Sequence, residues 1–155
     1  MTAVADFLRR HLEPSLDMLA DAIRLCPDDF WTETMAGYPY WRQMYHALES
    51  LDYWLTVKAV GAGGEAYEAQ RFGKDVSPEL DGDCREVVVK GELLAFLGDL
   101  RSRLDSLLAV VGEGDAAAVD ALLTQIRHIQ YHVGHGDAAL RSRGAAPGVW
   151  KGYGE

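Results

Sequence analysis

Basic residues are scarce in this chain. It carries 15 Lys and Arg against 24 Asp and Glu, which gives a net charge of −9 over 155 residues. Binding of nucleic acid begins with Lys and Arg that neutralise phosphates, and the sequence has no basic stripe that could do so. Arg141 and Arg143 lie at the expected end of the last helix, where positive charge suits the helix dipole. We therefore expect neither nucleic acid nor an anionic membrane surface as a partner.

Cysteines and long apolar runs are also scarce. Cys26 and Cys84 lack CxxC spacing and are too few for a disulfide framework, so cysteine-based metal binding is not expected. The N-terminus lacks the basic start and uninterrupted apolar core of a signal peptide. No apolar run approaches the length that spans a bilayer. These absences predict a soluble cytoplasmic protein with two free thiols.

What the sequence has in abundance is helical periodicity. Apolar residues recur at spacings of three and four over residues 2–25, 40–60, 91–111 and 115–143. Amphipathic helices bury their apolar stripes best by packing together, so we predict an all-α four-helix bundle in a single domain over residues 1–155. The apolar stripes expected in its core are Phe7, Leu8, Leu12, Leu16, Leu19 and Ile23; Trp41, Met44, Leu48, Leu51 and Leu55; Leu93, Leu97, Leu100, Leu104, Leu107, Leu108 and Val111; and Leu122, Ile126, Ile129, Val133 and Leu140.

Glycines and prolines suggest how the four helices connect. Pro14 either kinks the first helix or marks its regular start. Residues 61–89 read as a long connection with a short helical turn at 65–71, and the strand-like run at 85–90 has no partner strand. The short link at 112–114 predicts that the third and fourth helices are antiparallel neighbours, with Asp115 as N-cap. An up-down-down-up path is open to such a chain.

Two histidines of the fourth helix are four residues apart. This spacing puts the rings of His128 and His132 on one helix face, where they can share one metal ion. On a helical wheel they occupy a small polar sector beside the core stripe, together with Thr124 and Gln125. Sectors that face solvent usually carry Lys and Glu, and this sector has neither. It is typical of a pocket lining.

The second helix carries a histidine in a similar sector. His46 lies with Tyr53 and Ser50 on a mixed polar and aromatic face, away from the core stripe of that helix. One cavity between the two helices explains both faces. Three histidines leave a coordination position open for water or substrate, which is the pattern of a catalytic rather than a structural metal site.

Two further residues are candidates for this site. His135 shares the face of His128 and is a candidate for a fourth ligand or a residue facing substrate, and Glu49 is a candidate ligand or orienting partner. A solvated glutamate is the simpler interpretation of Glu49, and His11 is expected at the surface. A di-iron bundle needs Glu three residues before each histidine. Gln stands at positions 43 and 125, so that class of site is rejected.

Four segments of the chain resemble a known family. The runs YHALESLDYWL, VVVKGELLAFLGDLRSRL, RHIQYHVGHGDAALRSRG and PGVWKGY resemble, in order and approximate spacing, the DinB/YfiT-like metalloenzyme family. The resemblance implies a four-helix bundle, often dimeric, with a divalent ion held by His46, His128 and His132. Nickel or zinc is the ion most expected, with iron or manganese as alternatives. Many members have Gln where this chain has His135, which is a departure that bears on metal preference.

The resemblance also frames the function. Some members resemble thiol S-transferases that use low-molecular-weight thiols, so the leading hypothesis is a metal-dependent enzyme with a small-molecule substrate, with His135 or Glu49 as proton carrier. A metal-dependent hydrolase, a non-catalytic metal-binding stress protein and a purely structural bundle are the alternatives. A homodimer is predicted, because Gly134 and Gly136 would allow close packing of another helix, although both fit a monomer equally well.

Overall fold

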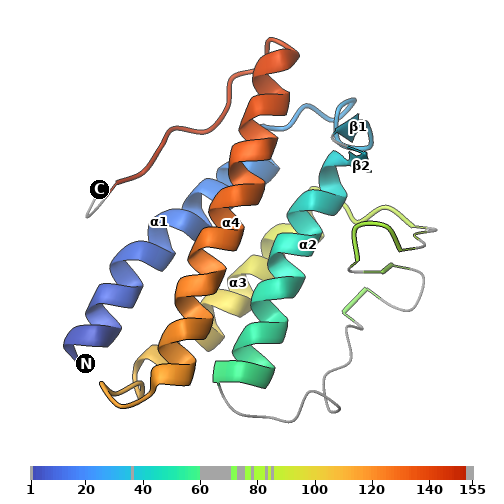
Figure 1. Ribbon diagram of the computed structural model, residues 1–155. Coiled ribbons are helices and arrows are strands. Elements are labelled where there is room, and N and C mark those ends of the chain that lie inside the picture. The colour runs from blue at the N-terminus through green and yellow to red at the C-terminus, as the bar shows by residue number, and fades with distance from the viewer. Residues whose placement is uncertain are drawn as a thin grey trace.

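Four helices hold most of the regular structure. The computed structural model describes residues 2–35, 37–59, 71–72, 76–77, 79–82, 84 and 86–152. The helices are α1 (Ala3–Leu25), α2 (Tyr40–Tyr53), α3 (Lys90–Leu108) and α4 (Ala116–Ser142) (Figure 1). The all-α prediction is confirmed, and Pro14 lies inside α1 without ending it. Residues 65–70 of the predicted helical turn lie outside the described residues.

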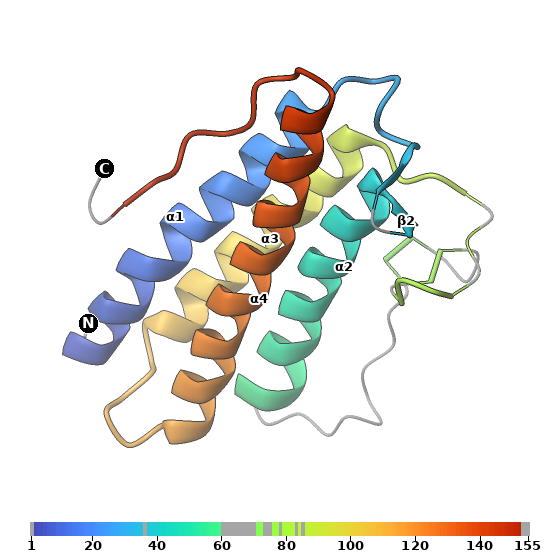
Figure 2. The ribbon, with the colours of Figure 1, turned by 45° about the horizontal axis from the view of Figure 1, so that its top comes forward.

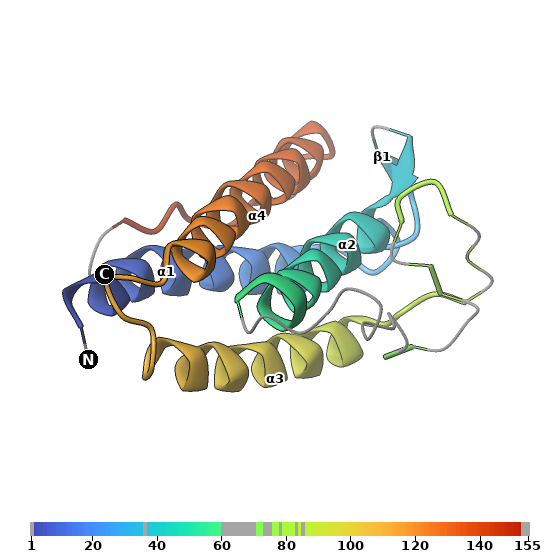
Figure 3. The same ribbon diagram turned by 60° about the horizontal axis from the view of Figure 1, so that its bottom comes forward.

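The helices run up, down, down and up (Figures 1 and 2). Helices α1 and α2 each pack against both α3 and α4. A view with the bottom of the bundle turned forward places α3 and α4 on opposite sides, with α1 and α2 between them (Figure 3). The prediction that these two helices are neighbours is therefore wrong, although they are antiparallel. The physical reason is the length of the link: α3 ends at Leu108, before the expected end at 111, and residues 109–115 are enough to cross the bundle.

The predicted apolar stripes form the core with two kinds of exception. The fully or almost fully buried predicted residues are Leu8, Leu12, Leu16, Leu19, Ile23, Trp41, Met44, Leu48, Leu51, Leu55, Leu93, Leu97, Leu100, Leu104, Leu108, Val111, Leu122, Ile129, Val133 and Leu140. Leu107 and Ile126 are partly buried against this core. Phe7 is exposed, and its ring packs against His11 instead of the interior. His11 is thus half-buried rather than a free surface residue.

The second helix changes its geometry before its expected end at residue 60. Helix α2 ends at Tyr53, and η1 (Trp54–Ala59) continues it as a π-helix. The N–H of Trp54 donates to the carbonyl groups of Ser50 and Leu51 at this junction. η1 packs closely against α4. With η1, the interface between α4 and the end of the second helix departs from regular helix packing next to the predicted pocket. Such π-helical turns are rare and occur frequently at functional sites.

A small hairpin sets the start of α2. Strands β1 (Thr34–Met35) and β2 (Tyr38–Pro39) pair antiparallel, with Gly37 at a positive φ of 94° in the turn. The N–H of Tyr40 then donates to the carbonyl of Glu33 at 2.9 Å. No strand was predicted here, because two residues are too few for an alternating pattern. The hairpin ties the first turn of α2 to the segment that follows α1.

The described part of the long connection lies against α2 and the core. The buried guanidinium of Arg42 donates to the carbonyl groups of Glu79 and Gly82. Val88 is buried, and its carbonyl accepts the indole N–H of Trp31 at 2.9 Å. Residues 86–89 form no strand, in agreement with the rejection of the strand reading. Cys26 and Cys84 are free thiols, as predicted.

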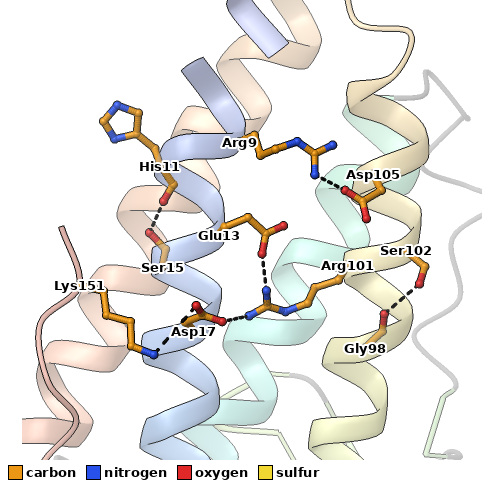
Figure 4. Close-up of polar contacts among 10 residues, drawn as sticks. All are labelled: Arg9, His11, Glu13, Ser15, Asp17, Gly98, Arg101, Ser102, Asp105 and Lys151. Atoms are coloured by element: carbon orange, nitrogen blue, oxygen red, sulfur yellow. Dashed lines mark hydrogen bonds and ion pairs between the residues drawn. The ribbon is translucent and has the colours of Figure 1, made fainter. Parts of the chain in front are cut away.

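Ion pairs join α1 to α3 on one side of the bundle (Figure 4). Arg101 of α3 bridges Glu13 and Asp17 of α1, and Arg9 pairs with Asp105. Exposed pairs of this kind each stabilise a fold by about 0–1 kcal/mol. They therefore orient two helices that the apolar core already holds together.

The C-terminal segment returns along α1. Gly144, at a φ of 72°, ends α4, and the N–H of Ala145 donates to the carbonyl of Leu140 at 2.9 Å in a Schellman motif. The predicted end of this helix at residue 143 is confirmed to within one residue. The following residues run beside α1 (Figures 1 and 2), where Lys151 pairs with Asp21 at 3.0 Å. Trp150 is 69% exposed, so its side chain is not folded onto the core.

The two glycines of α4 have different surroundings. A Cβ on Gly136 would lie 2.9 Å from the Tyr40 hydroxyl oxygen and 3.2 Å from the Met44 methyl, whereas a Cβ on Gly134 would meet nothing within 4 Å. Gly136 is therefore required by packing within the chain, and it no longer argues for a dimer. The homodimer stays a prediction.

We expect opposite effects from the same substitution at these two positions. Gly136→Ala should lower the free energy of unfolding by about 1–2 kcal/mol, because the buried Tyr40 ring must shift. Gly134→Ala should raise it by about 0.5–1 kcal/mol through helix propensity. Urea denaturation of both variants measures this difference. Equal effects would contradict the close packing of α2 on α4.

Candidate metal centre

Three histidine rings meet between α2 and α4. His46 of α2 lies with its ring centroid 5.2 Å from that of His128 and 5.1 Å from that of His132, and the latter two centroids are 4.6 Å apart. One nitrogen from each ring lies within 4.8 Å of the others. The predicted convergence of these residues is confirmed. Two antiparallel helices bring together residues that are more than 80 positions apart.

The two histidines of α4 point the same nitrogen at each other. Their Nε2 atoms are 3.0 Å apart, as the four-residue spacing on one helix face allows. Imidazole nitrogens bind zinc at about 2.0–2.1 Å, so a cation could contact both nitrogens with little movement of either ring. The pair is therefore arranged in the way a shared ion requires.

Gln43 fixes the orientation of His132. Its side-chain oxygen lies 3.0 Å from His132 Nδ1. Because an amide oxygen only accepts, Nδ1 carries the hydrogen and Nε2 is left with its lone pair facing His128. Metal-binding histidines usually donate their other N–H to such a partner, which sets the tautomer. In the sequence, Gln43 stood out only because a di-iron site would need a glutamate at this position. Its position three residues before His46 was the signal that could have revealed it.

One proton lies between the Nε2 atoms of His128 and His132, and a cation can bind both atoms only if this proton moves. Since His132 has its proton on Nδ1, His128 must donate from its own Nε2 across the 3.0 Å contact. The Nδ1 of His128 is buried and has no hydrogen-bond partner among the described residues. A cation could replace the shared hydrogen if that proton moved to Nδ1. The donor set thus fits a divalent ion that prefers imidazole ligands.

Burial keeps the rings of His128 and His132 neutral. Desolvation, with smaller contributions from the imidazoles of His128, His46 and His135, lowers the pKa of His132 to about 3. Desolvation likewise lowers the pKa of His128 to about 4, with a smaller contribution from His46. Only the neutral imidazole has a lone pair for a metal. The protein environment therefore favours the form of the side chain that can act as a ligand.

Two buried polar residues lie one helical turn from the histidines. Glu49 of α2 is 3% exposed and accepts a long hydrogen bond from the Tyr45 hydroxyl at 3.5 Å, so the expectation of a solvated glutamate is wrong. Gln125 of α4 is 1% exposed, and its side-chain oxygen has no partner among the described residues. The Gln43–His132 contact between antiparallel helices places these two residues at about the same level. They do not belong to the close histidine group.

His135 is not part of the three-histidine group either. Its ring packs against Tyr131 with centroids 4.2 Å apart, and Tyr131 in turn lies edge-on to His132 at 5.3 Å. Direct ligation by His135 is therefore not supported, whereas a position beside the candidate ligands is. His11 lies on α1, outside the group (Figure 4).

Comparisons with known proteins identify no relative. No family model matches the chain, and neither a curated protein nor a solved structure shows detectable similarity. Among the described residues, no helix has both the length and the apolar character needed to cross a membrane.

The neutral histidines make the metal-free protein sensitive to acid. The folded pKa values of about 4 and 3 lie below the unfolded value of about 6.5, so the unfolded chain binds more protons between these limits. The contribution of these two histidines to the free energy of unfolding is thus fully present above about pH 6.5, and it decreases as the pH drops toward 4. Each histidine contributes a slope of at most about 1.4 kcal/mol per pH unit.

Urea denaturation of the metal-free protein between pH 7 and pH 4.5 measures this slope. The variant His128→Gln/His132→Gln should show a shallower loss of stability than the wild-type chain, because it lacks both groups. Parallel profiles for the two proteins would show that the histidines are not buried in neutral form.

Proposed function

We propose that the chain is a metal-dependent enzyme that holds one divalent ion with His46, His128 and His132. The convergence of three imidazole nitrogens within 4.8 Å is the observation that carries this proposal. Three protein ligands leave a coordination position for water or substrate, which is typical of catalytic rather than structural sites. Nickel or zinc suits the imidazole set best, and iron or manganese is the alternative.

The favoured reaction is a thiol S-transfer. In this reaction a low-molecular-weight thiol, bound next to the ion, would be transferred through its sulfur to an electrophilic substrate. The resemblance of the four sequence runs to the DinB/YfiT-like family supports this choice, and with it a cytoplasmic homodimer. A bound divalent ion would supply Lewis acidity that favours a thiolate over a thiol. The chain itself contributes the tautomer of His132, set by Gln43, and a proton acceptor in Glu49 or His135.

A metal-dependent hydrolase is the second candidate. The buried carboxylate of Glu49, with the Tyr45 hydroxyl beside it, favours it, because a buried carboxylate is a suitable base for a water molecule. A non-catalytic metal-binding protein would use the same three ligands and would be recognised by an ion that no external ligand reaches.

Elemental analysis tests the metal site. We expect the purified protein to bind one nickel or zinc ion per chain, because three imidazole nitrogens already converge at one place. His46→Ala should lose stoichiometric metal, whereas His11→Ala, which changes a histidine outside the group, should keep it. Wild-type protein without stoichiometric metal after exposure to both ions would overturn the proposal.

Substitution with Co²⁺ then separates the three functions. A small thiol should produce a sulfur-to-cobalt charge-transfer band in the wild-type protein, and turnover with an electrophile should follow. Hydrolysis of esters or amides without thiol turnover would favour the hydrolase. A cobalt spectrum that no thiol, azide or cyanide changes would indicate a closed, non-catalytic site.

We expect Gln43 to contribute to metal affinity without being a ligand. Gln43→Leu removes the acceptor of His132 Nδ1 and should weaken metal binding by about 10–100-fold. Gln43→Glu keeps an acceptor and should retain most of the affinity. Gln130→Leu is the matched control, because Gln130 donates to Ser15 and Met18 of α1, away from the histidines. Competition with a chelator of known affinity measures all three variants.

A further inference from the structure

A groove lies beside the C-terminal half of α4. It has a volume of about 360 Å³, within the range of small-molecule pockets. Its walls come from α4 on one side and from the segment between α1 and α2 on the other. The lining residues are Phe30, Thr34, Met35, His135, Ala138, Ala139, Ser142 and Arg143.

The groove continues the face of α4 that carries the metal ligands. His128, His132, His135, Ala139 and Ser142 follow one another at spacings of four, three, four and three, which places them in one row on the helix. The first two are in the histidine group, and the last three line the groove. The groove therefore begins about one helical turn beyond the candidate metal centre, with His135 at the boundary.

The middle of the groove is apolar and its far end is cationic. Its apolar lining consists of Phe30 and Met35 from the segment between α1 and α2, and of Ala138 and Ala139 from α4. Arg143 stands at the far end, with its guanidinium 4.9 Å from the Phe30 ring centroid. Glu33 pairs with one terminal nitrogen of Arg143, and Glu33 does not line the groove. A guanidinium has five N–H donors, so others remain for a ligand.

We propose that this groove binds the substrate of the metal centre, and that the substrate is a small carboxylate with an apolar body. The carboxylate meets Arg143, the apolar body lies between Phe30 and Ala139, and the opposite end reaches His135. Eight residues of helix separate His135 from Arg143, which corresponds to about 12 Å. The link to catalysis rests on the proposed function, whereas binding in the groove does not.

The probe for this inference is 4-(4-fluorophenyl)butyrate, observed by ¹⁹F NMR, because its carboxylate and its fluorine lie at opposite ends. We expect saturable binding to the metal-free, full-length protein. Arg143→Gln should weaken binding about tenfold, because it removes a charge-assisted hydrogen bond. The corresponding amide should bind more weakly to the wild-type protein, and Arg143→Gln should not affect it.

Two further variants separate the groove from the rest of the surface. Ala138 is exposed and lines the groove, so Ala138→Leu should fill the groove and abolish binding without disturbing the fold. Ala117→Leu, at an exposed position in the first turn of α4, and Arg127→Gln, at an exposed arginine outside the groove, should leave binding unchanged. Absence of saturable binding, or binding that survives Ala138→Leu, would overturn the inference.

A Co²⁺ arm tests the link to the metal centre. In the cobalt-loaded protein the ¹⁹F signal of the bound probe should broaden strongly, because the fluorine end points toward His135. Binding in the groove without cobalt-induced broadening would contradict a substrate role for the groove. Failure of the protein to take up cobalt would instead defeat the proposed function, while the metal-free titration would still report on the groove.

Discussion

The register of α2 against α4 is the constraint on which the candidate site depends. His46 meets His128 and His132, and Gln43 meets His132, only because α2 lies at one depth and one rotation relative to α4. A shift of α2 by one residue would turn its side chains by about 100° and separate the three rings. The main determinants of this register lie outside the site. The hairpin holds the first turn of α2, and the Tyr40 hydroxyl, which donates to the carbonyl of Ala22, lies close against Gly136.

Polar groups buried between these helices have a cost that the apolar core must offset. Gln43 and Glu49 of α2 and Gln125 and His132 of α4 are all buried, at positions where leucines would pack with greater gain. A buried polar group without a hydrogen bond costs about 1–3 kcal/mol, and the side-chain oxygen of Gln125 lacks one among the described residues. Such local departures from optimal packing are expected at functional sites. Their concentration at one interface supports the choice of this interface as the functional one.

Apolar periodicity in the sequence was sufficient to predict the four helices, and the spacing of the histidines was sufficient to select His128 and His132 as candidate ligands. A spacing of four on one helix face is readable from the chain, so His128 and His132 could be paired without a structure. The contact between Gln43 and His132 spans two helices, and no local pattern contains their relative register. The same limit explains why α3 was expected beside α4. The sequence gives the length of the link at 109–115, but the direction of this link depends on where α1 and α2 lie. The π-helix of η1 likewise has no signature in apolar spacing.

The groove beside α4 lies at the negative end of a helix dipole, which at first argues against an anionic ligand. A dipole disfavours an anion at this end by about 0.3–1 kcal/mol. Two features reduce that effect here. The N–H groups of Gly144 and Ala145 already satisfy the carbonyl groups of Arg141 and Leu140, so fewer bare oxygens face the groove. Arg143 is paired with Glu33, but its guanidinium keeps further N–H donors at the same place, and a hydrogen bond to a charged group contributes about 1.5–3 kcal/mol. The guanidinium outweighs the dipole, so the cationic end of the groove determines which end of a ligand it receives.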